Sequence, residues 1–283
     1  MTQDGEQVMT DSAAQPYDNA PIGVFDSGLG GLTALRELRR RMPEENIVYF
    51  GDTGRLPYGE KTLEQLRVMA SQDLELIARQ GVKAILVACG TLSSNTPELL
   101  DGFSLPCFGV LRPSIAAMAR TPGDGPLGII ATAATIRSGA FERALRAACP
   151  GREIRPVPCP DLVPLIESGH TGPEDPLLLD AARRYTASLR DCAAVLLGCT
   201  HYGIVEEALR LFLDEGTLLV SAAACGAEAV ADYLEEQGLR GGNGEERYLA
   251  SGDPAAFTAS ASLLLGRSLE GLVRGVPVMR IEL

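Results

Sequence analysis

The chain has 283 residues, 46% of them hydrophobic and 22% charged, which is the balance of an ordinary globular protein of about two domains. Its net charge of −12 argues against a nucleic-acid partner, which needs clustered basic residues, but does not exclude a small anionic ligand. No apolar run approaches the roughly 18 residues of a membrane span. Residues 1–20 hold neither Lys nor Arg, so they predict a disordered tail and no targeting peptide.

The cysteines argue for a reducing compartment. There are seven of them, an odd number, and none shows CxxC spacing. This pattern matches neither a zinc site nor a disulfide framework, so we expect free thiols, no metal and a cytoplasmic location. Four are expected to be small buried hydrophobic residues, namely Cys107, Cys149, Cys192 and Cys225.

Short apolar runs alternate with amphipathic stretches along the whole chain. In the first part, strands are predicted at 21–25, 46–50, 85–87 and 105–110, and helices at 32–41 and 63–80. After a Pro- and Gly-rich stretch at 121–125, strands are predicted at 127–132, 154–157, 193–197 and 218–221, and helices at 135–149, 161–168, 177–189 and 222–236. A last strand at 247–251 precedes a helix at 254–265. This alternation predicts an α/β fold with mainly parallel sheets flanked by helices.

Two of the predicted strands end in a cysteine followed by small polar residues. The run 85–87 leads into Cys89-Gly90-Thr91, and the run 193–197 leads into Gly198-Cys199-Thr200-His201-Tyr202. A thiol in such a turn sits where helix-end N–H groups lower its pKa and hold anions. We therefore expect a pocket between two similar α/β units, with one thiol on each wall.

The first strand runs into a glycine-rich turn, DSGLGG, at 26–31. The turn lacks the full GxGxxG order that a dinucleotide site requires. We interpret it as a tight turn that exposes Asp26 and Ser27 at the carboxyl edge of a sheet, where open α/β folds bind ligands. The loop at 51–59 follows the next strand and either carries function or only shapes a turn.

Two opposed thiols can act as general base and general acid on the two faces of one carbon and so invert a stereocentre. Each thiol needs a pKa tuned from about 8.5. Asp26 is a candidate partner for the thiol on one side, and His201 with Glu167 for the thiol on the other. Another interpretation is an acyl-transfer or hydrolytic site of Cys199, His201 and Glu167, which leaves Cys89 without a role.

A pyridoxal enzyme is disfavoured by the placement of the lysines. Lys83 precedes an apolar strand on the side away from its turn, and Lys61 lies in a polar stretch, so neither suits a Schiff base. No cofactor is expected.

Four segments occur in order and carry a family resemblance: FDSGLGGLTALREL, YFGDTGRLPYGEKT, VACGT and LGCTHY. With them the chain resembles the glutamate racemases of the cofactor-independent aspartate/glutamate racemase family. The segments ATAATIRSGAF and CPDLVPLIESG are similar to two further family segments, and the resemblance covers residues 21–265.

The resemblance implies two pseudo-symmetric α/β domains with the active site in the cleft between them. We assign residues 21–115 and 222–283 to the first domain and residues 116–221 to the second. The resemblance further implies interconversion of L- and D-glutamate without a cofactor, which supplies D-glutamate for peptidoglycan and so for cell-wall biogenesis and cell shape. It also implies a homodimer.

The site residues follow residue by residue. Cys89 and Cys199 match the two acid/base cysteines, and Asp26, Glu167 and His201 match the residues that assist them. The substrate-contacting positions match Asp26, Ser27, Pro57, Tyr58, Gly59, Gly90, Thr91, Thr200 and His201.

The sequence departs from the family pattern at three positions. Gly90 stands where the family usually has Asn, Gly203 replaces a usual Pro, and Arg112 replaces a common acidic residue. Gly90 removes an amide from the expected substrate site, although its backbone N–H remains. This motivates two alternatives: a racemase of aspartate or another α-substituted acid, and a binding module without activity.

Overall fold

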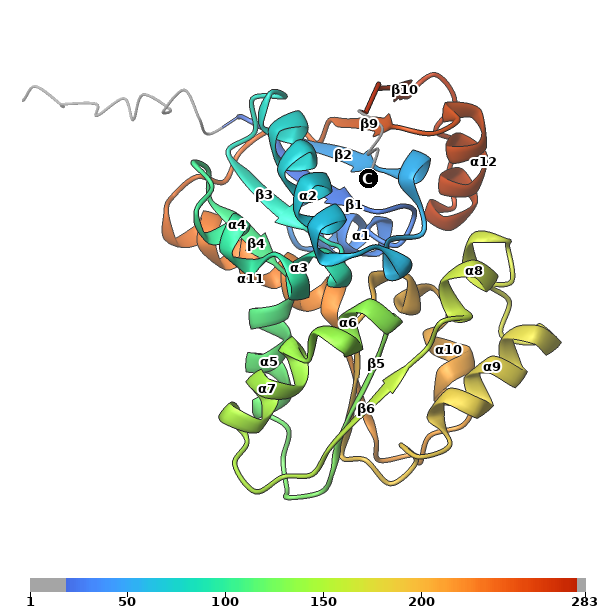
Figure 1. The fold of residues 1–283 in the computed structure, drawn as a ribbon. Helices are drawn as coiled ribbons and strands as arrows, with labels where there is room; N and C mark the ends of the chain where they lie inside the picture. Colours follow the sequence, from blue (N-terminus) through green and yellow to red (C-terminus); the bar gives the residue numbers. More distant parts are fainter. Residues whose placement is uncertain (1–18, 279–283) are drawn as a thin grey trace, which may run out of the picture.

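The structure, a computed structural model, describes residues 19–278, so nearly all of the tail predicted for residues 1–20 lies outside the described residues. Ten strands in this range form two sheets in which every pairing is parallel (Figure 1). The larger sheet has the order β10 (Val273–Gly275), β9 (Glu246–Ala250), β2 (Ile47–Gly51), β1 (Ile22–Asp26), β3 (Ala84–Val87), β4 (Cys107–Gly109). The smaller has the order β6 (Ile154–Pro158), β5 (Leu127–Ala131), β7 (Ala194–Leu197), β8 (Leu218–Ser221).

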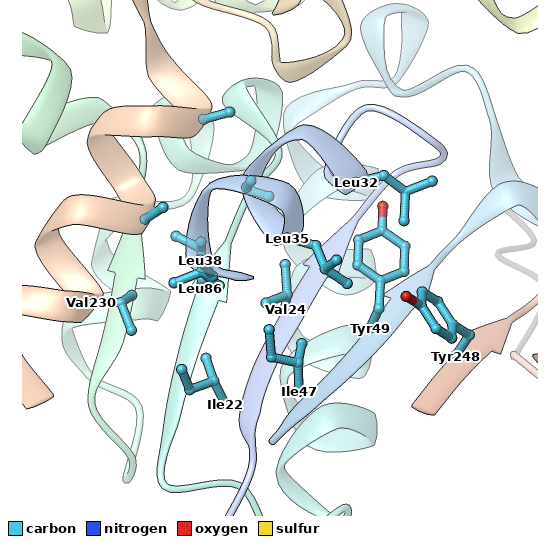
Figure 2. Close-up of a cluster of buried hydrophobic side chains, with 14 of the residues drawn as sticks. Ile22, Val24, Leu32, Leu35, Leu38, Ile47, Tyr49, Leu86, Val230 and Tyr248 are labelled. Carbon is cyan, nitrogen blue, oxygen red and sulfur yellow. The ribbon is translucent and has the colours of Figure 1, made fainter. Parts of the chain in front are cut away.

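Helices cover both faces of the larger sheet. One face packs against α1 (Leu32–Arg41), α11 (Ala222–Glu236) and α12 (Pro254–Leu265). The other face packs against α2 (Leu63–Ala78), and residues of α3 (Gly90–Asn95) and α4 (Pro97–Asp101) belong to the same core. The two cores alternate along β1, because Val24 faces α1 whereas Phe25 faces α2. Figure 2 shows the first core, in which Leu35 and Leu38 of α1 lie over the strands.

The smaller sheet is covered in the same way. One core joins it to α8 (Leu162–Glu167), α9 (Pro176–Thr186) and α10 (Glu206–Arg210). The other joins it to α5 (Leu111–Ala119), α6 (Ala133–Ser138) and α7 (Ala140–Ala148). Burial of these strands on both faces explains their continuous apolar runs, since a strand of a covered parallel sheet has no solvent face.

The α/β class and the parallel sheets are confirmed, and the structure has α1, α11, α12 and β8 at their predicted residues. The predicted helix at 135–149 is wrong in one respect: α6 and α7 are separate helices, because Gly139 between them has a left-handed φ of 63°. The strands partition between the sheets as the proposed domains require, while the domain bounds themselves stay a prediction. None of the helices within residues 19–278 combines the length and apolar character of a membrane span.

Candidate active site

The register of the strands brings the predicted site residues to one place. In the larger sheet Asp26 pairs with Gly51 and Phe25 with Val87, so the turns after β1, β2 and β3 share one edge. The turns after β5, β6 and β7 share an edge of the smaller sheet in the same way. Parallel α/β sheets bind ligands outside such carboxyl edges.

A cavity of about 70 Å³ lies where the two edges meet. It is small beside the roughly 300–1,000 Å³ of sites for drug-sized ligands, which favours a small occupant. Its lining includes all of the predicted site residues except Glu167: Asp26, Ser27, Pro57, Tyr58, Gly59, Cys89, Gly90, Thr91, Cys199, Thr200 and His201. Cys89 thus follows a strand of the larger sheet and Cys199 a strand of the smaller one, as expected from the sequence.

The side chains of Cys199, His201 and Glu167 contact one another in that order. Its Sγ lies 3.7 Å from His201 Nδ1, and His201 Nε2 lies 2.6 Å from Glu167 Oε1. Burial lowers the pKa of His201, but the hydrogen bonds to Cys199 and Glu167 outweigh burial and raise it well above its ordinary value. Burial raises the pKa of Glu167, and the His201 hydrogen bond and charge reverse this to a net lowering. The pair is therefore imidazolium and carboxylate, which places a positive ring beside Cys199 Sγ.

The surroundings of Cys89 favour the neutral thiol instead. Its Sγ donates a hydrogen bond to Ser27 Oγ at 3.8 Å. Burial raises the pKa of Cys89, the charge of Asp26 raises it further, and the Leu92 N–H opposes both less strongly. The expectation that the strand-end turn lowers this pKa is therefore wrong for Cys89, because desolvation exceeds the effect of the N–H group. The site pairs a protonated thiol with a thiol beside a cation.

Asp26 is held by its own turn. Its Oδ2 accepts hydrogen bonds from Gly28 N at 3.1 Å and Gly31 N at 3.0 Å. Its Oδ1 accepts a hydrogen bond from Thr200 Oγ1 at 3.4 Å, which comes from the other sheet. Asp26 acts on the Cys89 thiol through its charge.

The sequence model of the Asp/Glu/Hydantoin racemase family matches residues 33–230. The chain belongs to this family. It is 44% identical to a glutamate racemase of Thermus thermophilus over 259 residues, which cover 90% of this chain and 96% of that protein.

Solved structures agree with this assignment. The crystal structure of the Thermus thermophilus glutamate racemase with β-chloro-D-alanine superposes with a TM-score of 0.82 at 42% identity, over 92% of this chain and 98% of that one. The Francisella tularensis glutamate racemase in complex with D-glutamate gives a TM-score of 0.82 at 30% identity, over 92% and 98% of the two chains.

Sequence reasoning missed several polar residues of the cavity lining, among them two that follow strands of the smaller sheet. Thr132 follows β5, and its Oγ1 lies 3.0 Å from Thr91 Oγ1 and 2.9 Å from Thr135 Oγ1. Cys159 follows β6 as a third thiol, which is buried and whose pKa is raised mainly by burial. Both stand at the carboxyl end of a predicted strand, so the rule that singled out Cys89 also identifies them.

Tyr58 borders the cavity, but its hydroxyl lies in a separate buried network. It donates hydrogen bonds to Asp52 and, at 3.0 Å, to Asp73 Oδ2, and Arg55 forms ion pairs with both carboxylates. These interactions fix the loop that carries Pro57, which is part of the cavity lining. Any contact of Tyr58 with a ligand is left to its ring and backbone.

The lack of a side chain at Gly90 has a structural reason. A Cβ at this position would lie 2.1 Å from the carbonyl oxygen of Gly198, in the turn that carries Cys199. The two cysteine turns are therefore in backbone contact across the cleft. The asparagine side chain that the family usually carries here has no room in this arrangement.

Proposed function

We propose that the chain interconverts L- and D-glutamate by two-base proton transfer between Cys89 and Cys199, and so supplies D-glutamate for peptidoglycan. The observation that carries the proposal is one small cavity with a thiol from each sheet on its walls, where the two thiols have unlike surroundings. The relatives named above are glutamate racemases, which supports glutamate as the substrate.

The reaction needs one base and one acid on opposite faces of the α-carbon. The Cys199 thiolate removes the α-proton and becomes a thiol, while the electron pair of the C–H bond stays on the substrate and delocalises into the α-carboxylate. Cys89 then gives its Sγ proton to the other face and becomes a thiolate. The product leaves with the two cysteines in exchanged states, from which the reverse reaction begins.

The other residues prepare these steps. The His201–Glu167 pair stabilises the thiolate form of Cys199 and, after transfer, sits beside a neutral thiol. Ser27 orients the Cys89 proton. Thr91 lines the cavity, and we propose that its hydroxyl and the backbone N–H groups of the strand-end turns stabilise charge that develops on the carboxylate.

The acyl-transfer alternative gives Cys89 no task, yet Cys89 lines the same cavity as Cys199. The aspartate alternative was motivated by Gly90, and relative rates on L-glutamate and L-aspartate separate the two substrates. We keep glutamate as the proposal because relatives that match over most of the chain carry that name.

The test replaces each thiol in turn. Cys89→Ser and Cys199→Ser should each lower racemisation of L-glutamate by at least about a thousandfold, since a serine hydroxyl is a far weaker acid than a thiol. Cys107→Ser, at a half-buried cysteine in β4 outside the cavity, is the matched control and should keep wild-type activity. Wild-type activity in either cavity variant would end the proposal.

Two further proposals rest on the resemblance and composition. We propose a homodimer, which sedimentation velocity tests directly. We also propose a cytoplasmic location, in keeping with seven free cysteines.

A further inference from the structure

The glycine-rich turn at 26–31 packs against the His201–Glu167 pair, although the turn follows β1 and the pair belongs to the smaller sheet's half. A Cβ at Gly28 would lie 2.6 Å from Glu167 Oε1, and a Cβ at Gly30 would lie 2.2 Å from His201 Nδ1. Between them, the Leu29 N–H donates a hydrogen bond to Glu167 Oε1 at 3.2 Å. Three successive residues thus touch the pair, and two of them have room to do so only as glycine.

The turn is rigid before it meets the pair. The hydroxyl of Tyr49, which is fully buried in β2, donates a hydrogen bond to the Gly28 carbonyl at 2.8 Å. Asp26 accepts hydrogen bonds from the N–H groups of Gly28 and Gly31. These bonds fix the direction of the Leu29 N–H, so it presents one donor at a set position rather than adapting to the carboxylate.

Glu167 Oε1 therefore has two partners, one from each half of the molecule. His201 Nε2 lies 2.6 Å away in its own half, and the Leu29 N–H reaches it from the other half. The charged and titratable groups that face His201 are Cys199, Glu167 and, from the turn, Asp26. If the two halves separate, the pair loses the Leu29 donor and the nearby Asp26 charge together.

We propose that residues 28–30 form a socket that positions the His201–Glu167 pair on Cys199, so that Cys199 is prepared for proton transfer only while the two halves are together. The assignment of a proton-transfer task to Cys199 rests on the proposed function, but the socket does not. Leu29 and the two glycines are positioning residues, because they act on Cys199 through His201 and Glu167.

Gly28→Ala is the sharpest test. The added methyl meets only side-chain atoms, those of Glu167 and a Leu56 methyl at 3.2 Å, so the fold can accept it by moving the carboxylate. The readout is the pH midpoint for alkylation of Cys199 by iodoacetamide, followed by mass spectrometry of its peptide. Cys89 in the same molecule is an internal control, and Gly203→Ala, whose Cβ meets Thr33 at an ordinary 3.5 Å, is the matched control variant.

The expected result is a rise of the Cys199 alkylation midpoint by about one pH unit in Gly28→Ala, which is a tenfold change in the acid dissociation constant of the thiol. The Cys89 midpoint and the Gly203→Ala midpoints should stay at the wild-type values. In the Glu167→Ala background, where the added methyl no longer meets a carboxylate, Gly28→Ala should add no further shift.

Three results would overturn the socket: a wild-type Cys199 midpoint in Gly28→Ala, equal shifts at both cysteines, or an undiminished shift in the Glu167→Ala background. The measurement uses no glutamate. A chain that fails to racemise glutamate but shows the expected midpoints therefore contradicts the proposed function and leaves the socket intact.

Discussion

Gly90→Ala adds a single methyl group at the contact between the two cysteine turns. The new Cβ would lie 2.1 Å from the Gly198 carbonyl oxygen, whereas ordinary contact begins at 3.4 Å. The obstacle is backbone and not a flexible side chain, so one turn must move by more than about 1 Å. Because each turn carries a cysteine, this movement changes the position of one thiol relative to the other.

Two magnitudes follow. Overpacking of this kind costs about 1–3 kcal/mol, so the midpoint of thermal unfolding should fall by several degrees. A displacement of reacting groups by about 1 Å can lower the rate about a hundredfold, so kcat/KM should fall far more than stability alone explains. Circular dichroism follows both the racemisation of L-glutamate and the thermal transition.

The control is Gly172→Ala, because a Cβ there meets nothing within 4 Å. It should match the wild type in both assays. If Gly90→Ala keeps wild-type kcat/KM, the two turns are not in backbone contact during the reaction, and the account of Gly90 is wrong.

Three further changes test other parts of the site. His201→Asn removes the cation beside Cys199, so kcat should fall about a hundredfold or more and the activity profile should move to higher pH. Arg137→Gln removes an exposed guanidinium that donates to the carbonyl of Gly59, a residue of the cavity lining, at 3.3 Å, and kcat/KM should fall two- to threefold with less dependence on salt. Asp73→Asn removes a carboxyl whose pKa burial and the Asp52 charge raise to about 8. Because the pKa of Asp73 is higher in the folded state, its contribution to stability is complete below the ordinary value of 3.8 and is lost as the pH rises through 8. The unfolding temperature of Asp73→Asn should therefore rise relative to that of the wild type between pH 5 and pH 8.

Each of these has its own contrary result. An unshifted pH–rate profile in His201→Asn would show that the His201 ring does not influence proton transfer at Cys199. Equal salt dependence in the wild type and Arg137→Gln would show that this guanidinium has no part in substrate entry. A constant difference in unfolding temperature across the pH range would mean that Asp73 is ionised in the folded protein at neutral pH.

Local pattern was enough to predict most of the fold and the two thiols. β3 and β7 are apolar runs of four residues, and each is followed by a turn with a cysteine. Neighbouring residues alone therefore indicate both the strand and the turn. The parallel order of the sheets then brings the turns together. Thr132 and Cys159 also follow predicted strands, but Cys159 stands between Pro158 and Pro160, without the small polar residues that mark the turns of Cys89 and Cys199.

The contact between the glycine-rich turn and Glu167 could not be predicted from the sequence. The Leu29 N–H and Glu167 are 138 positions apart, and nothing in either segment indicates the other. Desolvation of Cys89 is likewise a product of the closed cavity, so reasoning from its helix-end position alone gave the wrong direction for its pKa. The helix α5 was missed because Pro113 lies in its first turns, where proline is tolerated but reads as a breaker.

The central claim is that one thiol removes the proton of the α-carbon and the other supplies a new one to the opposite face, without help from a cofactor. The most direct measurement incubates the purified chain with L-glutamate in heavy water, with no added cofactor, and follows optical rotation and α-proton exchange together. The account predicts that rotation decays to zero while solvent deuterium enters the α-position, and that D-glutamate reaches the same end point. Glutamate that binds but neither racemises nor exchanges its α-proton would contradict it.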